Sequence, residues 1–250
     1  MSPRTQLALA AVAMVTVVGC EPDPFEPPGP DDTPATVVDL DQAPGDPCTQ
    51  ELMVRIEGPS GPYCIDRFEA SLEGAVLGNA AQGSDDADLS LDGSTTAVAR
   101  NELQAQPRVQ ISWYQAQAAC QNSGKRLCTV EEWERACRGP DLFIYPYGDD
   151  IDDRACNGFF RASGNEEVLA TGSLEDCGNP EGVYDMSGNV AEWTATAFPR
   201  IPGQEALIDR AVRGGSFESN FSALRCLGEE FHLPPATLDV TVGFRCCAEP

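Results

Sequence analysis

Eleven cysteines constrain this 250-residue chain more than any other feature, because they decide in which compartment it can fold. One of them, Cys20, closely follows a mainly apolar run from Leu7 to Val18, which has Arg4 before it. A run of that length is too short to cross a bilayer as a helix and is typical of a secretory signal. The other ten, an even number in an exported chain, predict up to five disulfides rather than metal ligands. We therefore expect the chain to fold in an oxidising extracytoplasmic compartment.

The tetrad from Val17 to Cys20 resembles a bacterial lipobox. This resemblance implies that residues 1–20 are a lipoprotein signal peptide and that Cys20 is acylated as the mature N-terminus. One acyl chain binds a membrane only marginally, whereas several on one residue anchor it firmly. Glu21 after the cysteine resembles signals that sort lipoproteins to the outer membrane, so we expect a lipid-anchored protein of the bacterial cell envelope. The alternative is an ordinary signal peptide in which this cysteine is incidental.

Residues 21–47 are predicted to form a disordered tether. They contain eight prolines and eight acidic residues, so backbone donors are missing and charges repel one another. At ~3.1 Å per residue in the polyproline form, the segment reaches about 80 Å. The whole chain has 40 acidic and 16 basic residues and a formal charge of -24, which excludes nucleic acid as a partner.

Residues 48–250 are predicted to form one folded domain. The chain is 42% hydrophobic and 7% aromatic, which suits a globular core. It shows no repeat of 20 to 50 residues, so a solenoid or propeller is not expected. Residues 72–106 are rich in Gly, Ala, Ser and Asp and are predicted to be a long surface insertion.

Two helices are predicted after this insertion. Ser112 can cap the first, which Gly124 ends. Thr129 and Glu132 form a capping box for the second, which Gly139 ends. Further on, Gly, Pro, Asn and Asp interrupt short apolar runs, a pattern that predicts turns and brief strands. The expected class is α+β, with two helices, few regular strands and long loops.

Seven short blocks follow one another in the order of a known family. They are CIDRFEAS (64–71), ISW (111–113), GKRLCTVEEWERACRG (124–139), YPYGDD (145–150), GVYDMSGNVAEWT (182–194), RGGSF (213–217) and VGFRCC (242–247). Together they resemble the formylglycine-generating enzyme family, also called the sulfatase-modifying factor domain, over nearly all of residues 48–250. The resemblance implies a variant of the C-type-lectin-like fold, with bound calcium and an active groove.

The resemblance also implies a structural calcium site in the fifth block. It specifies Asp185 and Glu192 by their side chains and Gly188 and Val190 by their carbonyl groups. Calcium takes six to eight oxygen ligands, which such a turn can supply in part. The alternative is a turn that is capped by its own polar side chains. A second calcium site of the family would begin at Asn157, but the segment after it is shorter here and its other ligands cannot be placed.

All ten remaining cysteines can be assigned to pairs. The resemblance supplies two of these pairs, Cys120–Cys246 and Cys137–Cys226. Neighbouring residues of an extended segment point to opposite faces, so Cys247 bridges to a different element than Cys246 does, which leaves Cys128 as its partner. The last two pairs follow only by elimination and proximity, Cys156–Cys177 and Cys48–Cys64.

The catalytic block departs from the family. Enzymes that this chain resembles carry two cysteines soon after the GGS turn, and these bind Cu(I), a soft ion that needs sulfur ligands. Here Ser219 and Leu224 stand in that segment, and the first cysteine after the turn is Cys226, which is already assigned to a disulfide. We therefore expect no catalytic residues of the family's kind and no copper.

Two hypotheses for the function follow. The first is a catalytically degenerate module that binds a protein, a peptide or a glycan at the cell surface. The second is an oxidoreductase of the family that acts on a protein or small molecule by an altered mechanism, for which Glu218, Glu229, Glu230 and His232 could supply an acid and a base. Acidic residues are abundant in this chain, and a lone histidine is more often a packed or surface residue than a catalyst. A lectin function would rest on fold analogy alone.

Overall fold

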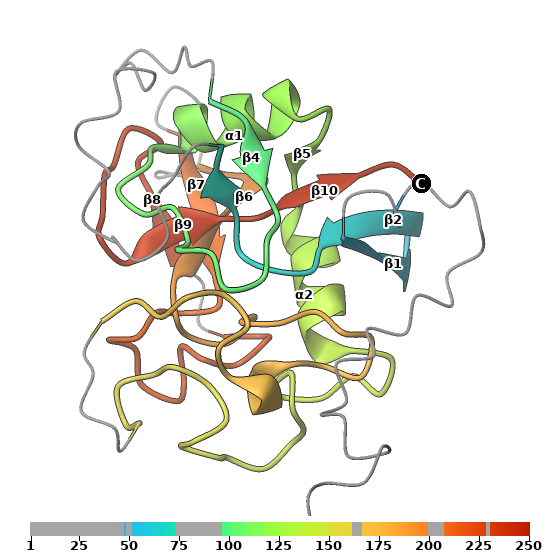
Figure 1. The fold of residues 1–250 in the computed structure, drawn as a ribbon, viewed down its shortest axis with the longest axis vertical. Coiled ribbons are helices and arrows are strands. Elements are labelled where there is room, and N and C mark those ends of the chain that lie inside the picture. The colour runs from blue at the N-terminus through green and yellow to red at the C-terminus, as the bar shows by residue number, and fades with distance from the viewer. Residues whose placement is uncertain (1–47, 49–51, 74–96, 162–166, 200–207, 229–230) are drawn as a thin grey trace, which may run out of the picture. The chain divides into compact units, whose positions relative to one another are not determined.

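A computed structural model describes residues 48, 52–73, 97–161, 167–199, 208–228 and 231–250 (Figure 1). The predicted signal peptide, Cys20 and the predicted tether lie outside these residues. No helix within the described ranges is long and apolar enough to span a membrane.

Regular structure is brief, as the sequence predicts. In chain order the elements are β1 (Met53–Gly58), β2 (Gly61–Asp66), β3 (Ser71–Leu72), β4 (Ala99–Arg100), α1 (Trp113–Asn122), β5 (Arg126–Leu127), α2 (Val130–Arg138), the 3-10 turn η2 (Glu175–Cys177), β6 (Ala191–Pro199), β7 (Ile208–Arg213), β8 (Phe231–Leu233), β9 (Val242–Phe244) and β10 (Cys246–Ala248). Figure 1 shows the sheets and α1 in the upper part of the view and long yellow and orange loops in the lower part. The fold is an α+β variant of the C-type-lectin-like fold.

Two four-stranded sheets organise the domain. Their strand orders are β1-β2-β10-β5 and β8-β7-β6-β9, and β3 pairs separately with β4. β6 and β9 are parallel, with Ala191 opposite Val242, whereas the other pairings among the described strands are antiparallel. β9 and β10 belong to different sheets and are separated by one residue, Arg245. The chain therefore passes from one sheet to the other at a single buried arginine.

Both predicted helices are present and are capped as expected. The Ser112 side chain accepts a hydrogen bond from the backbone N–H of Gln115, and the Gln115 side-chain oxygen accepts one from the Ser112 backbone N–H. Thr129 and Glu132 form the same reciprocal pair at the start of α2. Gly139 ends α2 with a φ of 62°, a left-handed conformation that costs glycine little.

The core consists mainly of two hydrophobic clusters. One surrounds Trp113 and Trp193 between α1 and the sheet of β6 to β9, and the other surrounds Trp133, Ile56 and Ile65 between α2 and β1–β2. Each tryptophan buries a large apolar area while its N–H finds an oxygen acceptor, because a buried donor without a partner is costly.

Five disulfides tie the loops to these clusters. They join Cys48–Cys64, Cys120–Cys246, Cys128–Cys247, Cys137–Cys226 and Cys156–Cys177. These are the five pairs expected from the sequence. Three of them connect residues that are 89 to 126 positions apart, so they restrict the unfolded chain strongly.

The predicted insertion at 72–106 differs from expectation at its ends. Leu72 pairs with Ala99 in the β3–β4 ladder, and both Ala99 and Ala105 are buried. The side chain of Asn101 accepts a hydrogen bond from the backbone of Phe68. The small side chains of Ala99 and Ala105 thus pack on the core, whereas Leu103 between them is exposed, and residues 74–96 lie outside the described part.

Candidate functional site

The segment predicted to bind calcium forms a tight loop between η2 and β6. Asp185 and Asn189 both have φ values of 58°, and Gly188 has a φ of 83°. A side chain at Gly188 would collide with the backbone carbonyl of Asn157, so only glycine fits there. The Gly188 N–H donates to the carbonyl of Gly214 at 2.9 Å, which fixes this loop against the GGS turn.

Glu69, which the sequence analysis did not single out, holds the other side of this loop. Its carboxylate accepts hydrogen bonds from the Asn189 side-chain amide at 2.6 Å and from the Val190 backbone N–H at 3.0 Å. Asn157 also lies here, because its amide donates to the side-chain oxygen of Asn189 at 3.0 Å. The structure thus brings Asn157 beside the fifth block, and the only sequence signal for Glu69 was its position within the CIDRFEAS block.

Glu192 is bound by a buried arginine. Arg245 donates from Nε and Nη2 to the Glu192 carboxylate at 2.7 to 2.9 Å, and the Trp133 indole N–H donates to it at 2.6 Å. Arg245 also donates to the carbonyl oxygens of Asp66 and Tyr184. Both oxygens of Glu192 therefore already have partners.

Negative charge still exceeds positive charge around this loop. Burial, reinforced by the neighbouring carboxylates of Asp185 and Glu192, raises the pKa of Glu69 well above its ordinary value. Burial also raises the pKa of Asp185 to about 6, although the Gly172 N–H donates to it at 2.7 Å. Three buried carboxylates thus face the single guanidinium of Arg245, which is an environment that favours a cation.

The residues present fit calcium in part. Within the described ranges, neither the Gly188 nor the Val190 carbonyl accepts a backbone hydrogen bond, and the Gly172 N–H donates to one of the two carboxylate oxygens of Asp185. Glu192 is engaged by Arg245, and the described residues hold no group of three or more acidic, histidine or cysteine side chains placed to bind a metal. Calcium at this loop stays a prediction.

We expect chelation to lower the melting temperature of the chain by on the order of 5 to 10 °C, if calcium stands well above its dissociation constant. Without the ion, the raised pKa of Asp185 makes the folded state lose stability as pH rises from about 4 to about 6. Added calcium should therefore stabilise more at pH 7 than at pH 5, where protons compete for this carboxylate. Calorimetry with and without EDTA at both pH values measures this, and identical melts would remove the calcium site.

A cavity of about 380 Å³ opens beside the GGS turn. Its lining includes Gly214, Gly215, Ser216, Glu218, Ser219 and Arg225. The two glycines have φ values of 92° and 66°, which turn the chain sharply after β7 and leave the backbone accessible. The cavity therefore occupies the place in which the family resemblance locates the active groove.

Oxygen rather than sulfur lines this cavity. The Ser219 hydroxyl accepts a hydrogen bond from the Ser216 backbone N–H at 2.9 Å and lies 3.4 Å from the Ser216 hydroxyl. Leu224 is buried against Gly158 and does not line the cavity. Cys226 is joined to Cys137, and all ten cysteines of the described residues are in disulfides. The described part of the chain thus offers no free thiol.

The acid and base considered from the sequence are not gathered at the cavity. Glu218 lines it, but His232 does not, although its neighbour Phe231 does. His232 instead pairs with Asp209 at 2.9 Å and stacks on Phe198 at 5.0 Å between ring centroids. Alternate residues of a strand point to opposite faces, which explains this placement. Glu229 and Glu230 lie outside the described residues.

Known proteins resemble this chain in sequence and in fold. The formylglycine-generating enzyme of Thermomonospora curvata is 35% identical over 170 residues, which are 58% of this chain and 56% of that enzyme. The inactive C-alpha-formylglycine-generating enzyme 2 of Mus musculus is 33% identical over 156 residues, which are 57% of this chain and 49% of that protein. The chain spans between 23% and 56% of the length of the first curated relatives that it matches.

Solved structures share the fold at low sequence identity. Treponema denticola variable protein 1 superposes with a TM-score of 0.59 and 20% identity, covering 79% of this chain and 95% of that one. The family model described as the sulfatase-modifying factor enzyme 1-like domain matches residues 63–250. Because this match covers well over half of the sequence, the chain belongs to the family of sulfatase-modifying factor enzyme 1-like domains.

Proposed function

We propose that this chain is a lipid-anchored extracytoplasmic module that binds a protein, peptide or glycan ligand through the cavity at Gly214 and Gly215 and does not make formylglycine. The observation that carries the proposal is the chemistry of this cavity. It keeps the turn and the volume of a binding groove, but its walls present the hydroxyls of Ser216 and Ser219 where copper chemistry needs sulfur.

Disulfide bonding supports the same proposal. Formation of formylglycine by the family's route requires two thiolates, and Cys226, the nearest cysteine along the chain, is held by Cys137 in α2. Opening this bridge would yield two thiols only by breaking the covalent link between α2 and the segment that follows the GGS turn. The relative named an inactive C-alpha-formylglycine-generating enzyme 2 is consistent with a family member whose fold is kept without the activity.

The anchoring part of the proposal comes from the lipobox and the tether. Acylation at Cys20 would hold residues 48–250 at the envelope surface, where an oxidising environment keeps the five disulfides closed. A ligand at that surface would meet a strongly acidic chain, while the cavity itself is lined by Arg213 and Arg225 as well as Glu218.

The proposal predicts that the purified full-length chain, supplied with copper and a cysteine-containing sulfatase peptide, consumes no oxygen and forms no aldehyde. The enzyme from Thermomonospora curvata, treated in parallel, is the positive control. Aldehyde on the peptide, detected by mass spectrometry, would contradict the proposal and favour an oxidoreductase with an altered mechanism. Oxygen consumption with another small molecule would favour the same alternative.

A further inference from the structure

A second cavity, of about 540 Å³, shares no lining residue with the one at the GGS turn. We call it the Tyr147 cavity. Tyr147 lines it together with two prolines and three carboxylates, and no Lys, Arg or His is among its described lining residues; the prolines and carboxylates are Pro146, Pro180, Asp152, Glu175 and Asp176. Apolar walls and an aromatic ring thus meet acidic groups in one cavity.

The aromatic wall is held in place. Tyr147 stacks on the buried Tyr145 with 5.3 Å between ring centroids and 6° between ring planes. The Tyr145 hydroxyl donates to the carbonyl of Phe221, which fixes the inner ring. Burial raises the pKa of Tyr147 to about 12, so its phenol stays neutral at physiological pH. The ring, which is partly exposed, therefore keeps its position and adds no negative charge.

A disulfide joins the wall that carries Glu175 and Asp176 to the segment that carries Asp152 and Ala155. Cys156, next to the lining residue Ala155, forms a disulfide with Cys177 at the end of η2, which carries Glu175 and Asp176. Both cysteines are buried in a small cluster on which Tyr147 packs. The cavity is thus formed before any ligand arrives, which lowers the entropic cost of binding.

These groups match one kind of side chain. A guanidinium is planar and stacks on an aromatic face, while its N–H groups bind carboxylates in pairs. The aliphatic stem of an arginine can pack along proline rings while its charged head meets the acids. Three carboxylates would repel an anionic group, and a purely apolar group would gain no attraction from them.

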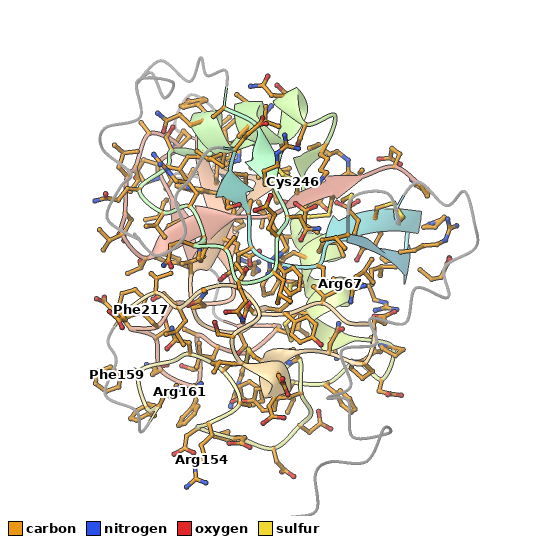
Figure 2. All side chains as sticks on the ribbon, in the orientation of Figure 1. Arg67, Arg154, Phe159, Arg161, Phe217 and Cys246 are labelled. Carbon is orange, nitrogen blue, oxygen red and sulfur yellow. A yellow bond between two sulfur atoms is a disulfide. The ribbon has the colours of Figure 1, made fainter. Side chains whose placement is uncertain are left out.

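A neighbouring arginine of the chain itself does not fill the cavity. Arg154 is two residues from Asp152, and its backbone N–H donates to that carboxylate at 2.8 Å, but its side chain is not among the lining groups. Figure 2 shows the Arg154 side chain at the lower edge of the view, pointing away from the ribbon. The Tyr147 ring is held by stacking, a disulfide joins the two walls, and the described lining holds three carboxylates without a cationic side chain. We therefore propose that the Tyr147 cavity binds an arginine side chain of a partner protein or peptide.

A pentapeptide amide with arginine at its centre and glycine elsewhere tests this, with glutamine in place of arginine as the matched neutral peptide. Titration of the full-length chain, followed by NMR, should shift the resonances of Tyr147, Ala155 and Glu175 with the arginine peptide alone. Tyr147→Ala should weaken this binding about two- to fivefold, while Tyr147→Phe, which keeps the ring, should restore it. Raising the salt concentration should weaken it further.

Charge variants distinguish binding at the Tyr147 cavity from non-specific attraction to an acidic protein. Removing the lining charges with Asp152→Asn, Glu175→Gln and Asp176→Asn together should weaken binding about tenfold. The matched control removes three exposed charges outside the lining, with Asp141→Asn, Asp150→Asn and Asp153→Asn. Equal losses in the two triple variants, or equal shifts with the glutamine peptide, would overturn the proposal. Failure of the ligand proposal at the GGS turn would leave this one intact, because the two cavities share no residue.

Discussion

Replacing Arg245 with methionine is expected to lower the free energy of unfolding by about 3 to 5 kcal/mol, the range measured when one partner of a buried ion pair is removed. The side chain is fully buried, and its guanidinium binds both oxygens of Glu192 and two backbone carbonyls. Without it, Glu192 would stay buried among further carboxylates with no positive charge in contact. Methionine fills similar space, so the loss reports on charge and hydrogen bonds more than on packing.

The position of Arg245 makes the effect global. It is the single residue between β9 and β10, and these strands belong to different sheets. Its hydrogen bonds reach the end of β2 and the loop before β6, so the side chain connects both sheets to the loop that is predicted to bind calcium. We therefore expect the transition to remain cooperative while its midpoint in urea falls.

Arg126→Met is the matched control. Arg126 also pairs with carboxylates, those of Glu132 and Glu249, but its side chain is 36% exposed and that of Glu249 is 79% exposed. Water screens such pairs, so the expected loss is about 1 kcal/mol or less. Urea unfolding followed by tryptophan fluorescence measures both variants. Equal destabilisation by the two substitutions would contradict the view that the buried pair of Arg245 with Glu192 stabilises the fold more than exposed ion pairs do.

Local signals in the sequence predicted local structure well. Ser112 and Thr129 are followed three residues later by Gln115 and Glu132, so each helix start has a capping pattern that acts within one turn. The adjacent Cys246 and Cys247 predicted bridges in opposite directions, because that alternation is a property of any extended segment. Such features depend on neighbours and need no knowledge of the whole fold.

Long-range pairing could not be predicted in the same way. The parallel register of Ala191 with Val242 joins residues whose local patterns are brief and unremarkable. Ala99 and Ala105 lie in the segment that was predicted to be a surface insertion, yet both side chains are buried. Short strands carry too few alternating positions to reveal which face is inside.

The candidate sites also differ in whether contiguous motifs or long-range contacts form them. The seven sequence blocks located the GGS turn and the loop that is predicted to bind calcium, since each block is a contiguous motif. Glu69 and Arg245 were missed as members of the charge cluster, although both lie in quoted blocks, because their contacts cross more than 50 positions of sequence. The Tyr147 cavity had no sequence signal at all. It lies where the Cys156–Cys177 bridge joins η2 to the segment that carries Asp152 and Ala155.

The central claim is that the cavity at Gly214 and Gly215 lacks the sulfur that the family's copper chemistry requires. Anaerobic titration of the full-length chain with Cu(I), against a competing chelator of high affinity, tests this claim most directly. The expected difference in bound Cu(I) is complete, because two thiolates hold this soft ion tightly and the hydroxyls of Ser216 and Ser219 do not. The enzyme of Thermomonospora curvata should withdraw copper from the chelator under the same conditions, which validates the assay.

We expect the present chain to leave all of the Cu(I) with the competing chelator, with its five disulfides intact by mass spectrometry before and after the titration. One equivalent of Cu(I) held tightly by the disulfide-intact chain, and lost on Ser219→Ala, would contradict the account.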